Sequence, residues 1–500
     1  MRLTKSALNL FRGKDPDPTA ATDGGRAVRD PRRAAGRGRV TARRRALGAS
    51  TVLAAAAFAV LGGTGLAGTA SAAALTAPNG ISYGTDGTGN PTTSDCTKTV
   101  AAGGSIQNAI NGAAAGAVIC VKAGDHSGAS LTINKAVTVR ANGVVKIESA
   151  VLTGGNVTLD GFTIVGGAAG TPGAGVSISG KSNEVVNNLI NGHGLKYGVS
   201  CWQNKCGSDT LIAHNTITRI NNYGIYVLNG DRITVERNNI YDLYDSVNNG
   251  LDVDGIRFFG SNHAIRHNYI HDLNAELSAS QPHLDCIQHY QSAGTGGAVN
   301  MTIENNYCVR VTGMCLITKN NLNNVYDLRD YTFRGNVCQT YGWQQVILSG
   351  INGVTMENNL FLGATKSGPN VTVENNPDSG AVSKNIRIRN NVMVRGDSKN
   401  ASIGNSSGTP VASGYLADNT KNVTWVDTTL VDDQAAFQNN PAHVTTPIVD
   451  KDFTTFRTES RKGNVLDQGA AALTSGLTAD VDGGARVRGS AVDIGAYELG

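Results

Sequence analysis

Residues 265–270 read Ile-Arg-His-Asn-Tyr-Ile, and the same phrase returns along most of the chain. Each copy has an apolar residue, two variable residues, an asparagine, another variable residue and a second apolar residue. The copies are VVNNLI (185–190), IAHNTI (212–217), VERNNI (235–240), IRHNYI (265–270), IENNYC (303–308), FRGNVC (333–338), MENNLF (356–361) and IRNNVM (388–393). Their asparagines, Asn188, Asn215, Asn238, Asn268, Asn306, Asn336, Asn359 and Asn391, are 27, 23, 30, 38, 30, 23 and 32 residues apart. A period of roughly 20 to 50 residues predicts a solenoid, because one copy is too short to bury a core alone.

Each phrase has the composition of a short strand, and a second short strand follows it. Examples of the second strand are GIYVL (224–228), GIRFF (255–259), CIQHY (286–290), CLITK (315–319) and QVILS (345–349). No long helical pattern separates the strands, so the repeat itself must carry the chain round to the next parallel strand. We therefore predict an all-β fold, a right-handed parallel β-helix with coils about 4.8 Å apart. The asparagines would form an amide ladder at an inward turn, and the alternative is a set of ordinary Asn-rich turns.

The first 72 residues have the composition of an export signal. They carry 13 Lys and Arg against 4 Asp and Glu, and Arg43, Arg44 and Arg45 precede an apolar stretch that ends in Ala70-Ser71-Ala72. This order predicts a secretory signal cleaved after Ala72, by the twin-arginine or the general route, with a membrane anchor as the alternative. We expect a secreted, extracellular protein with no membrane association after signal removal.

The charge of the remaining chain argues against nucleic acid as a partner. The formal charge of the whole sequence is +4, but the leader holds +9 of it (13 minus 4), which leaves −5 for residues 73–500. A mildly acidic protein is not attracted to phosphate backbones. We expect a monomer.

Beyond the leader, the pattern divides the mature chain into three segments. Residues 73–116 form a lead-in whose stretch 105–113 (SIQNAINGA) predicts a short helix that caps the open end of the solenoid. Coils occupy 117–430. Residues 431–500 lose the repeat and are expected to form a less regular C-terminal cap.

Eight cysteines fit an oxidising compartment. The column positions suggest the pairs Cys286 with Cys315 and Cys308 with Cys338, although the latter two could be core thiols. Cys201 and Cys206 could close a small loop, which leaves Cys96 with Cys120. No Cys or His spacing suggests zinc.

Three stretches resemble one known family. SIQNAI with VICVKAG (105–110 and 118–124), the coils with paired asparagines, and the ending DVDGGARVRGSAVDIGAYE (480–498) are similar to secreted bacterial parallel β-helix proteins of the pectin-lyase-like superfamily. This resemblance covers nearly the whole mature chain. It implies polysaccharide lyases, polygalacturonase-like hydrolases or uronate epimerases, and it specifies the fold much better than the reaction.

Loop lengths indicate where a site would lie. Ten residues separate Asn215 from the first core residue of the next strand, but 18 separate Asn238 from Ile256 and 19 separate Asn268 from Ile287. Two adjacent coils thus carry matched insertions at one corner. Long loops on a rigid scaffold commonly carry function, so we expect a cleft wall here; the alternative is a pair of tolerated insertions.

The two long loops place ionisable residues in columns. When Ile256 is aligned with Ile287, Asp254 stacks on Asp285. The same alignment places Asp252 beside His283 and Arg257 beside Gln288. Alternation along a strand predicts that Arg257 and Gln288 face outward, as does Lys319 in the following coil.

A second charged column follows the asparagine ladder by four residues and reads Arg219, Asp242, Asp272, Arg310. Stacked carboxylates repel unless a cation intervenes. The column could be a structural charge ladder. Alternatively, Asp242 and Asp272 could join Asp252 in binding Ca²⁺, and the sequence suggests no other cofactor. No EF-hand pattern is present.

These residues suggest an enzyme acting on a polysaccharide, with an acidic polymer as the expected partner. For β-elimination, Arg257 would neutralise the uronate carboxylate, and Lys319 or His283 would be the base. Other side chains on the same strands would contact the substrate or assist the leaving group. Those substrate-binding candidates are Tyr226, Gln288, His289 and Tyr290. For hydrolysis, the paired carboxylates would be Asp254 and Asp285, with Asp252 in reserve. A uronate epimerase is a third reaction, and a solenoid that binds polysaccharide without catalysis is the remaining alternative.

Overall fold

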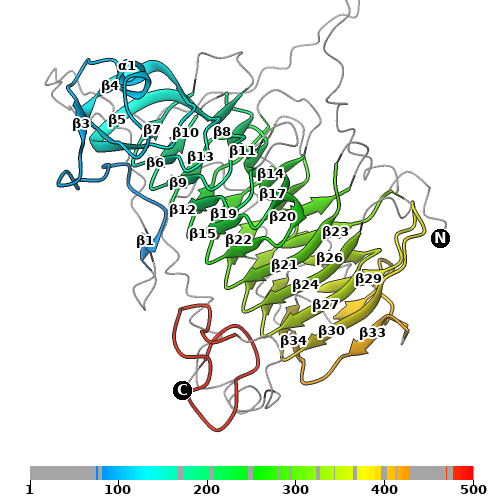
Figure 1. Cartoon of the computed structure of the whole chain (residues 1–500). Helices are drawn as coiled ribbons and strands as arrows, with labels where there is room; N and C mark the ends of the chain where they lie inside the picture. Colours follow the sequence, from blue (N-terminus) through cyan, green and yellow to red (C-terminus); the bar gives the residue numbers. More distant parts are fainter. Residues whose placement is uncertain are drawn as a thin grey trace, which may run out of the picture. The chain divides into compact units, whose positions relative to one another are not determined.

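The computed structural model confirms the predicted parallel β-helix (Figure 1). It describes residues 75–76, 82–166, 173–192, 194–201, 207–245, 252–275, 278, 282–291, 295–322, 327–342, 344–363, 369–395, 402–412, 414–426, 469 and 477–498. The predicted leader, 1–72, and most of the predicted C-terminal cap lie outside these residues.

Three parallel sheets run along the solenoid, and the chain passes through them in the order I, II, III in each coil. Sheet I contains β7 (Thr163–Ile164), β10 (Leu189–Asn191), β13 (Thr216–Thr218), β16 (Asn239–Tyr241), β19 (Tyr269–Leu273), β22 (Tyr307–Val311), β25 (Val337–Thr340), β28 (Leu360–Gly363), β31 (Val392–Arg395) and β34 (Val423–Val426). Sheet II contains β8 (Ala174–Ile178), β11 (Tyr197–Cys201), β14 (Tyr223–Asp231), β17 (Val253–Ser261), β20 (Leu284–Tyr290), β23 (Leu316–Lys319), β26 (Val346–Ser349), β29 (Val371–Glu374) and β32 (Ile403–Gly404). Sheet III contains β6 (Thr158–Asp160), β9 (Glu184–Val186), β12 (Leu211–Ala213), β15 (Thr234–Glu236), β18 (Ala264–Arg266), β21 (Ala298–Glu304), β24 (Leu328–Arg334), β27 (Asn352–Glu357), β30 (Lys384–Arg389) and β33 (Leu416–Asp418).

The N-terminal end is closed as the sequence predicted. Helix α1 (Ile106–Asn111) begins at Ser105, whose side chain accepts a hydrogen bond from the Asn108 amide, and its Ile106 and Ile110 are buried against the first coils. The long strands β4 (Val118–Ile133) and β5 (Thr138–Leu152) follow it. Before it lie β3 (Lys98–Val100) and the short antiparallel pair β1 (Leu75–Thr76) and β2 (Ser82–Tyr83). The described part of the chain has no helix long and apolar enough to cross a membrane.

The predicted asparagine ladder is present at the turn from sheet III to sheet I. The Nδ2 group of each asparagine donates to the Oδ1 atom of the next, and its backbone N–H donates to the same Oδ1, all at 2.9–3.1 Å. Asn422 adds one rung beyond the eight predicted, because Asn391 donates to it in the same way. The ladder therefore satisfies polar groups that are buried between coils.

The residue before each ladder asparagine has a positive φ. It is 54° at Arg237, 52° at His267 and 54° at Asn305, and Gly335 takes the same place at 63°. Left-handed backbone is unfavourable for residues other than glycine. The ladder amide offsets this cost, because Asn268 Nδ2 also donates to the Arg266 carbonyl, which closes the turn around His267.

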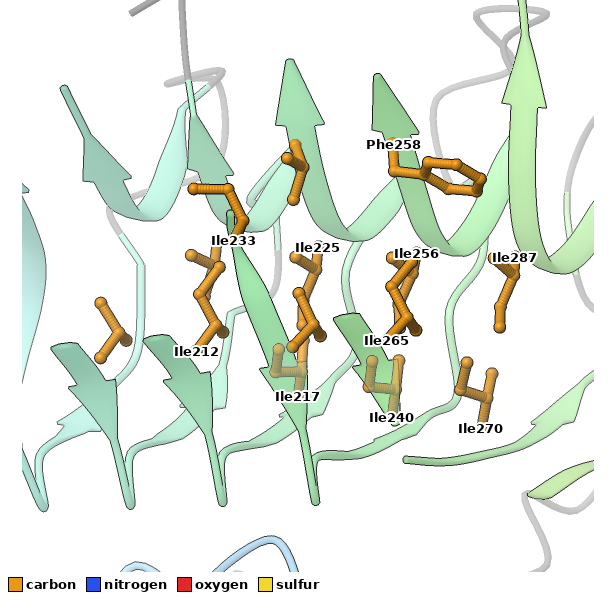
Figure 2. Close-up of a cluster of buried hydrophobic side chains, with 14 of the residues drawn as sticks. Ile212, Ile217, Ile225, Ile233, Ile240, Ile256, Phe258, Ile265, Ile270 and Ile287 are labelled. Atoms are coloured by element: carbon orange, nitrogen blue, oxygen red, sulfur yellow. The ribbon is translucent and has the colours of Figure 1, made fainter. Parts of the chain in front are cut away.

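The interior is filled by aligned apolar columns (Figure 2). In sheet II, Ile225, Ile256 and Ile287 are in register, and Leu316 continues the column. In sheet I, Ile217, Ile240 and Ile270 are in register. All of them are buried. Each coil thus buries apolar surface only against its neighbours, which is how a solenoid obtains its stability.

The outer surfaces of sheets I and III differ from each other. Sheet III carries alternating charges that pair between coils, in the order Glu236, Arg266, Glu304, Arg334, Glu357 and Arg389. In its later coils sheet I carries apolar residues outside, such as Tyr307, Leu360 and Val392, and residues of the segment 477–498 pack on them together with Tyr83. Tyr307 donates to Asp482, and Asn358 donates to the Asp493 carbonyl.

Two of the predicted disulfide pairings are wrong. Cys96–Cys120 is present, but the other described bridges are Cys286–Cys308 and Cys315–Cys338, which join sheet II to sheet I. The reason is the direction in which the cysteine side chains point. Cys286 and Cys315 occupy the position of Gly255 in the preceding coil, and a Cβ atom there would point at the sheet I residue Ile270, 2.7 Å from its Cγ2 atom. Cys201 is also disulfide-bonded, and its predicted partner, Cys206, lies outside the described residues.

Candidate active site

The lengthened corner lies where the chain enters sheet II at β17 and β20. The predicted register is confirmed: Asp254 pairs with Asp285, Ile256 with Ile287, and Arg257 with Gln288. The N–H of Val253 donates to the His283 carbonyl, so Asp252 and His283 lie side by side in adjacent coils, as expected. Residues 246–251, 276–277 and 279–281 of the two long loops lie outside the described part.

Asp285 is held by three hydrogen bonds. Its Oδ1 accepts from the Met314 N–H at 2.6 Å, and its Oδ2 accepts from Gln288 Nε2 at 3.0 Å and contacts His283 Nδ1 at 2.6 Å. Its side chain is 0% exposed. A carboxylate so placed fixes the tautomer and the orientation of the imidazole that it contacts.

His283 is the most accessible member of the cluster, with 32% of its side chain exposed. Burial alone would lower its pKa, but the Asp285 carboxylate outweighs burial, and Asp252 and Asp254 add to the effect, so the pKa is raised to about 9. The ring is therefore an imidazolium at neutral pH. Because Asp285 takes Nδ1, the Nε2–H is the group directed to other partners.

Arg257 lies beneath this cluster. Its Nη1 donates to the Tyr223 hydroxyl at 2.9 Å and lies 3.4 Å from Asp252 Oδ2 and 3.5 Å from Asp254 Oδ2. The guanidinium also covers the Tyr223 ring, 5.1 Å from its centroid. Only 2% of its side chain is exposed. Arg257 is therefore on the outer side of sheet II, as predicted, but it is buried and already balances two carboxylates.

Asp254 is fully buried and has an unusual charge environment. Its Oδ1 atom has no hydrogen-bond partner. Burial raises the pKa of Asp254 well above its ordinary value, Arg257 offsets this only in part, and Asp285 and Asp252 raise it further. A carboxyl group whose pKa is raised beside another acidic group is a candidate for proton transfer.

The predicted substrate contacts separate into two groups. Tyr226 and Tyr290 are partly exposed, and Lys319 is in register with Tyr290, with its Nζ 6.0 Å from the ring centroid. In contrast, Gln288 is 1% exposed and bonded to Asp285. His289 is fully buried against Phe258 and Phe259, and burial lowers its pKa to about 3. The structure thus places Gln288 and His289 behind the surface that a substrate would meet.

The second charged column lies apart from this cluster, at the end of the sheet I strands. Asp272 is bonded to Arg310 at 2.5 and 2.9 Å and to His271 at 2.6 Å. Asp242 lies 3.6 Å from Arg219. Asp252 faces Arg257 instead of these two aspartates. Among the described residues, no three His, Cys, Asp or Glu side chains are gathered so that they could hold a metal ion.

Tyr223 and the Met314 amide are parts of the site that the sequence analysis did not select. Tyr223 is in register with Asp254, and its ring stacks on Tyr197 at 5.6 Å between centroids. Extending the column of Asp254 and Asp285 back by one coil would have identified Tyr223. The Met314 N–H carries no signal in the residue type, because backbone donors are the same at every position.

The comparisons with known proteins assign no family to the chain. No protein-family model and no curated protein matches the chain. Similar solved structures include pectate lyase Pel9A, with 16% identity over 81% of this chain and 97% of that chain and a TM-score of 0.43. Another is the PL6-family polysaccharide lyase Pedsa3628 from Pseudopedobacter saltans, with 14% identity over 66% and 92% and a TM-score of 0.38. A third is the catalytic unit of a GH87 α-1,3-glucanase from Streptomyces thermodiastaticus, with 16% identity over 69% of each chain and a TM-score of 0.29.

Proposed function

We propose that this protein is a secreted polysaccharide lyase that cleaves a uronic-acid-containing polymer by β-elimination at the corner formed by β17, β20 and β23. The observation that carries the proposal is the order of exposure in the cluster. The side chain of His283 is 32% exposed and that of Asp252 is 22%, against 2% for Arg257 and 0% for Asp254 and Asp285. A polymer lying on this corner would therefore meet the His283 cation first, with Asp254 and Asp285 turned inward.

An exposed imidazolium backed by buried carboxylates suits an acidic ligand. In β-elimination a base takes the proton from the carbon beside the carboxyl group, a double bond forms, and the glycosidic oxygen leaves with a proton. The carboxylate must be neutralised for that proton to be acidic, and His283 would do this through its Nε2–H. Arg257, the neutraliser suggested by the sequence, is buried and would instead hold Asp252 and Asp254 in place.

Lys319 and Tyr290 are our candidates for moving the two protons. They lie side by side on β23 and β20 and are partly exposed. One would take the proton from the sugar carbon, and the other would return a proton to the leaving oxygen. Proton transfer by a positioned side chain commonly contributes about 10²- to 10⁴-fold to a rate.

A matched pair of substrates tests the proposal. The protein is offered an acidic polysaccharide and the same polymer after its carboxyl groups have been reduced to alcohols, and unsaturated product is followed by ultraviolet absorbance. We expect product from the acidic polymer only, with the His283→Gln variant losing most of the activity. Equal cleavage of both polymers would contradict a reaction that depends on the carboxylate.

Glycoside hydrolysis is a second candidate, and Asp254 is the observation that favours it. Asp254 carries a raised pKa and lies in register with the hydrogen-bonded Asp285, so the two could divide the roles of acid and base. Against this, both side chains are 0% exposed. New reducing ends without ultraviolet absorbance, abolished in Asp254→Asn, would establish the hydrolase instead.

A further inference from the structure

Two disulfides lie directly beneath the candidate site, and each is one residue away from a group that forms it. Cys286 follows Asp285, and Cys315 follows Met314, whose N–H donates to Asp285 Oδ1 at 2.6 Å. Their partners, Cys308 and Cys338, are in register on the neighbouring sheet I strands β22 and β25. All four cysteines are buried. The two bridges thus tie sheet II to sheet I in consecutive coils.

The preceding coil shows what these positions hold without a bridge. Gly255 in β17 faces Ile270 in β19, and the packing is tight, with 2.7 Å from a built Cβ to Ile270 Cγ2. Ile270 is in register with Cys308. The Gly and Ile pair of that coil is therefore replaced by a Cys and Cys pair where Asp285 is positioned. Packing alone suffices one coil earlier, so the bridges supply something other than filled volume.

The two disulfides flank a tightly packed contact between β20 and the residues just before β23, where the Met314 N–H donates to Asp285. The backbone segments of Cys286 and Met314 are paired, because the Cys286 N–H donates to the Met314 carbonyl at 2.8 Å. A Cβ atom on Gly313 would come within 1.6 Å of the Leu284 carbonyl oxygen and 2.7 Å of Asp285 Oδ1. A small slip of β23 against β20 would therefore break the Met314 to Asp285 hydrogen bond, and Asp285 in turn holds His283.

We propose that Cys286–Cys308 and Cys315–Cys338 are positioning residues of the site, which fix the spacing of β20 and β23 and thereby the hydrogen bond from Asp285 to His283. The role given to His283 in catalysis rests on the proposed function, but the positioning itself does not. The groups that face His283 are Asp285, Asp252 and Asp254, with Arg257 beyond them. Displacing Asp285 would remove the nearest of these charges from the imidazole.

The test replaces each bridge by the Gly and Ile pair of Gly255 and Ile270. The variants are Cys286→Gly with Cys308→Ile, and Cys315→Gly with Cys338→Ile. The titration of His283 is followed by NMR of protein labelled with ¹³C in histidine, and the His283→Gln variant assigns the signal. We expect a midpoint about one pH unit or more below that of the unchanged protein in both variants, in the direction of the ordinary value near 6.5.

The control removes a bridge far from the site. Cys96→Ala with Cys120→Ala should leave the His283 titration unchanged, although it lowers the melting temperature. If a Gly and Ile variant does not fold, as judged by circular dichroism, the Ala pair at the same positions is titrated in its place. An unchanged His283 midpoint in the folded variants of both bridges would overturn the proposal. The readout needs no substrate, so a polymer screen without product would count against the lyase but not against the positioning role.

Discussion

Replacing Asn268 by alanine tests the ladder at its centre. Asn268 Nδ2 donates to Asn306 Oδ1, the Val235 carbonyl and the Arg266 carbonyl, at 2.9–3.1 Å. Its Oδ1 accepts from the N–H and from the Nδ2 of Asn238, at 3.1 and 3.0 Å. The side chain is fully buried. Five hydrogen bonds between three coils therefore depend on one amide.

The expected loss of stability depends on which hydrogen-bond partners of Asn268 keep another bond in the variant. Asn238 Nδ2 still donates to the Ile212 carbonyl, and the Arg266 carbonyl still accepts from the Arg237 N–H. The Asn238 N–H loses its Asn268 acceptor and stays buried, whereas the Val235 carbonyl lies in the paired strands β15 and β18. An orphaned buried group costs about 1–3 kcal/mol, so we expect a loss of about 1–3 kcal/mol in the free energy of unfolding.

The assay is urea unfolding followed by circular dichroism, with the slope compared between variants so that a change in midpoint reports stability. The control is Asn134→Ala, because Asn134 is exposed and the chemical change is the same. We expect the control to stay within about 0.5 kcal/mol of the parent. An Asn268→Ala midpoint equal to that of the control would refute the view that the ladder stabilises the coils.

Three further predictions concern the site. Asp285→Asn should lower kcat by about 10²-fold or more and should also lower the melting temperature, because the neutral amide no longer supports the His283 imidazolium; unchanged kcat on a cleaved polymer would contradict this. Since the folded pKa of His283 is raised to about 9, its stabilising effect is complete below about pH 6.5 and is lost as the pH rises through 9. The stability difference between the parent and His283→Gln should therefore shrink over that range, and a difference that grows with pH would show the sign to be wrong. For the calcium site suggested by the sequence, Arg219 and Arg310 already balance Asp242 and Asp272, so we expect EDTA to leave the melting temperature unchanged; a fall that added Ca²⁺ reverses would establish a site.

The fold was predictable because the repeat fixes the register. Once the core residues Ile256 and Ile287 are aligned, the pairing of Asp254 with Asp285 and of Arg257 with Gln288 follows, and the structure shows both. The capping helix followed from the short amphipathic pattern of residues 105–113. These features depend on spacing along the chain, which the sequence contains in full.

The features that the sequence did not predict depend on where side chains point and on how deeply their neighbours bury them. Column position alone suggested Cys286 with Cys315, whereas the side chains cross the interior to sheet I. Alternation assigned Arg257 and Gln288 to the outer side correctly, but it does not report that neighbouring side chains bury them. The return of residues 477–498 onto sheet I was not foreseen, because a non-repeating segment has no register to align.

The central claim is that the corner of β17, β20 and β23 cleaves an acidic polysaccharide by elimination. The most direct test incubates the mature protein with pectic, alginate, glycosaminoglycan and neutral polysaccharides and measures ultraviolet absorbance and new reducing ends in parallel. We predict that both signals rise together on a uronate polymer and that both are lost in His283→Gln. Reducing ends without absorbance, or no product from any polymer of the panel, would contradict the lyase, the first in favour of a hydrolase and the second in favour of a binding solenoid.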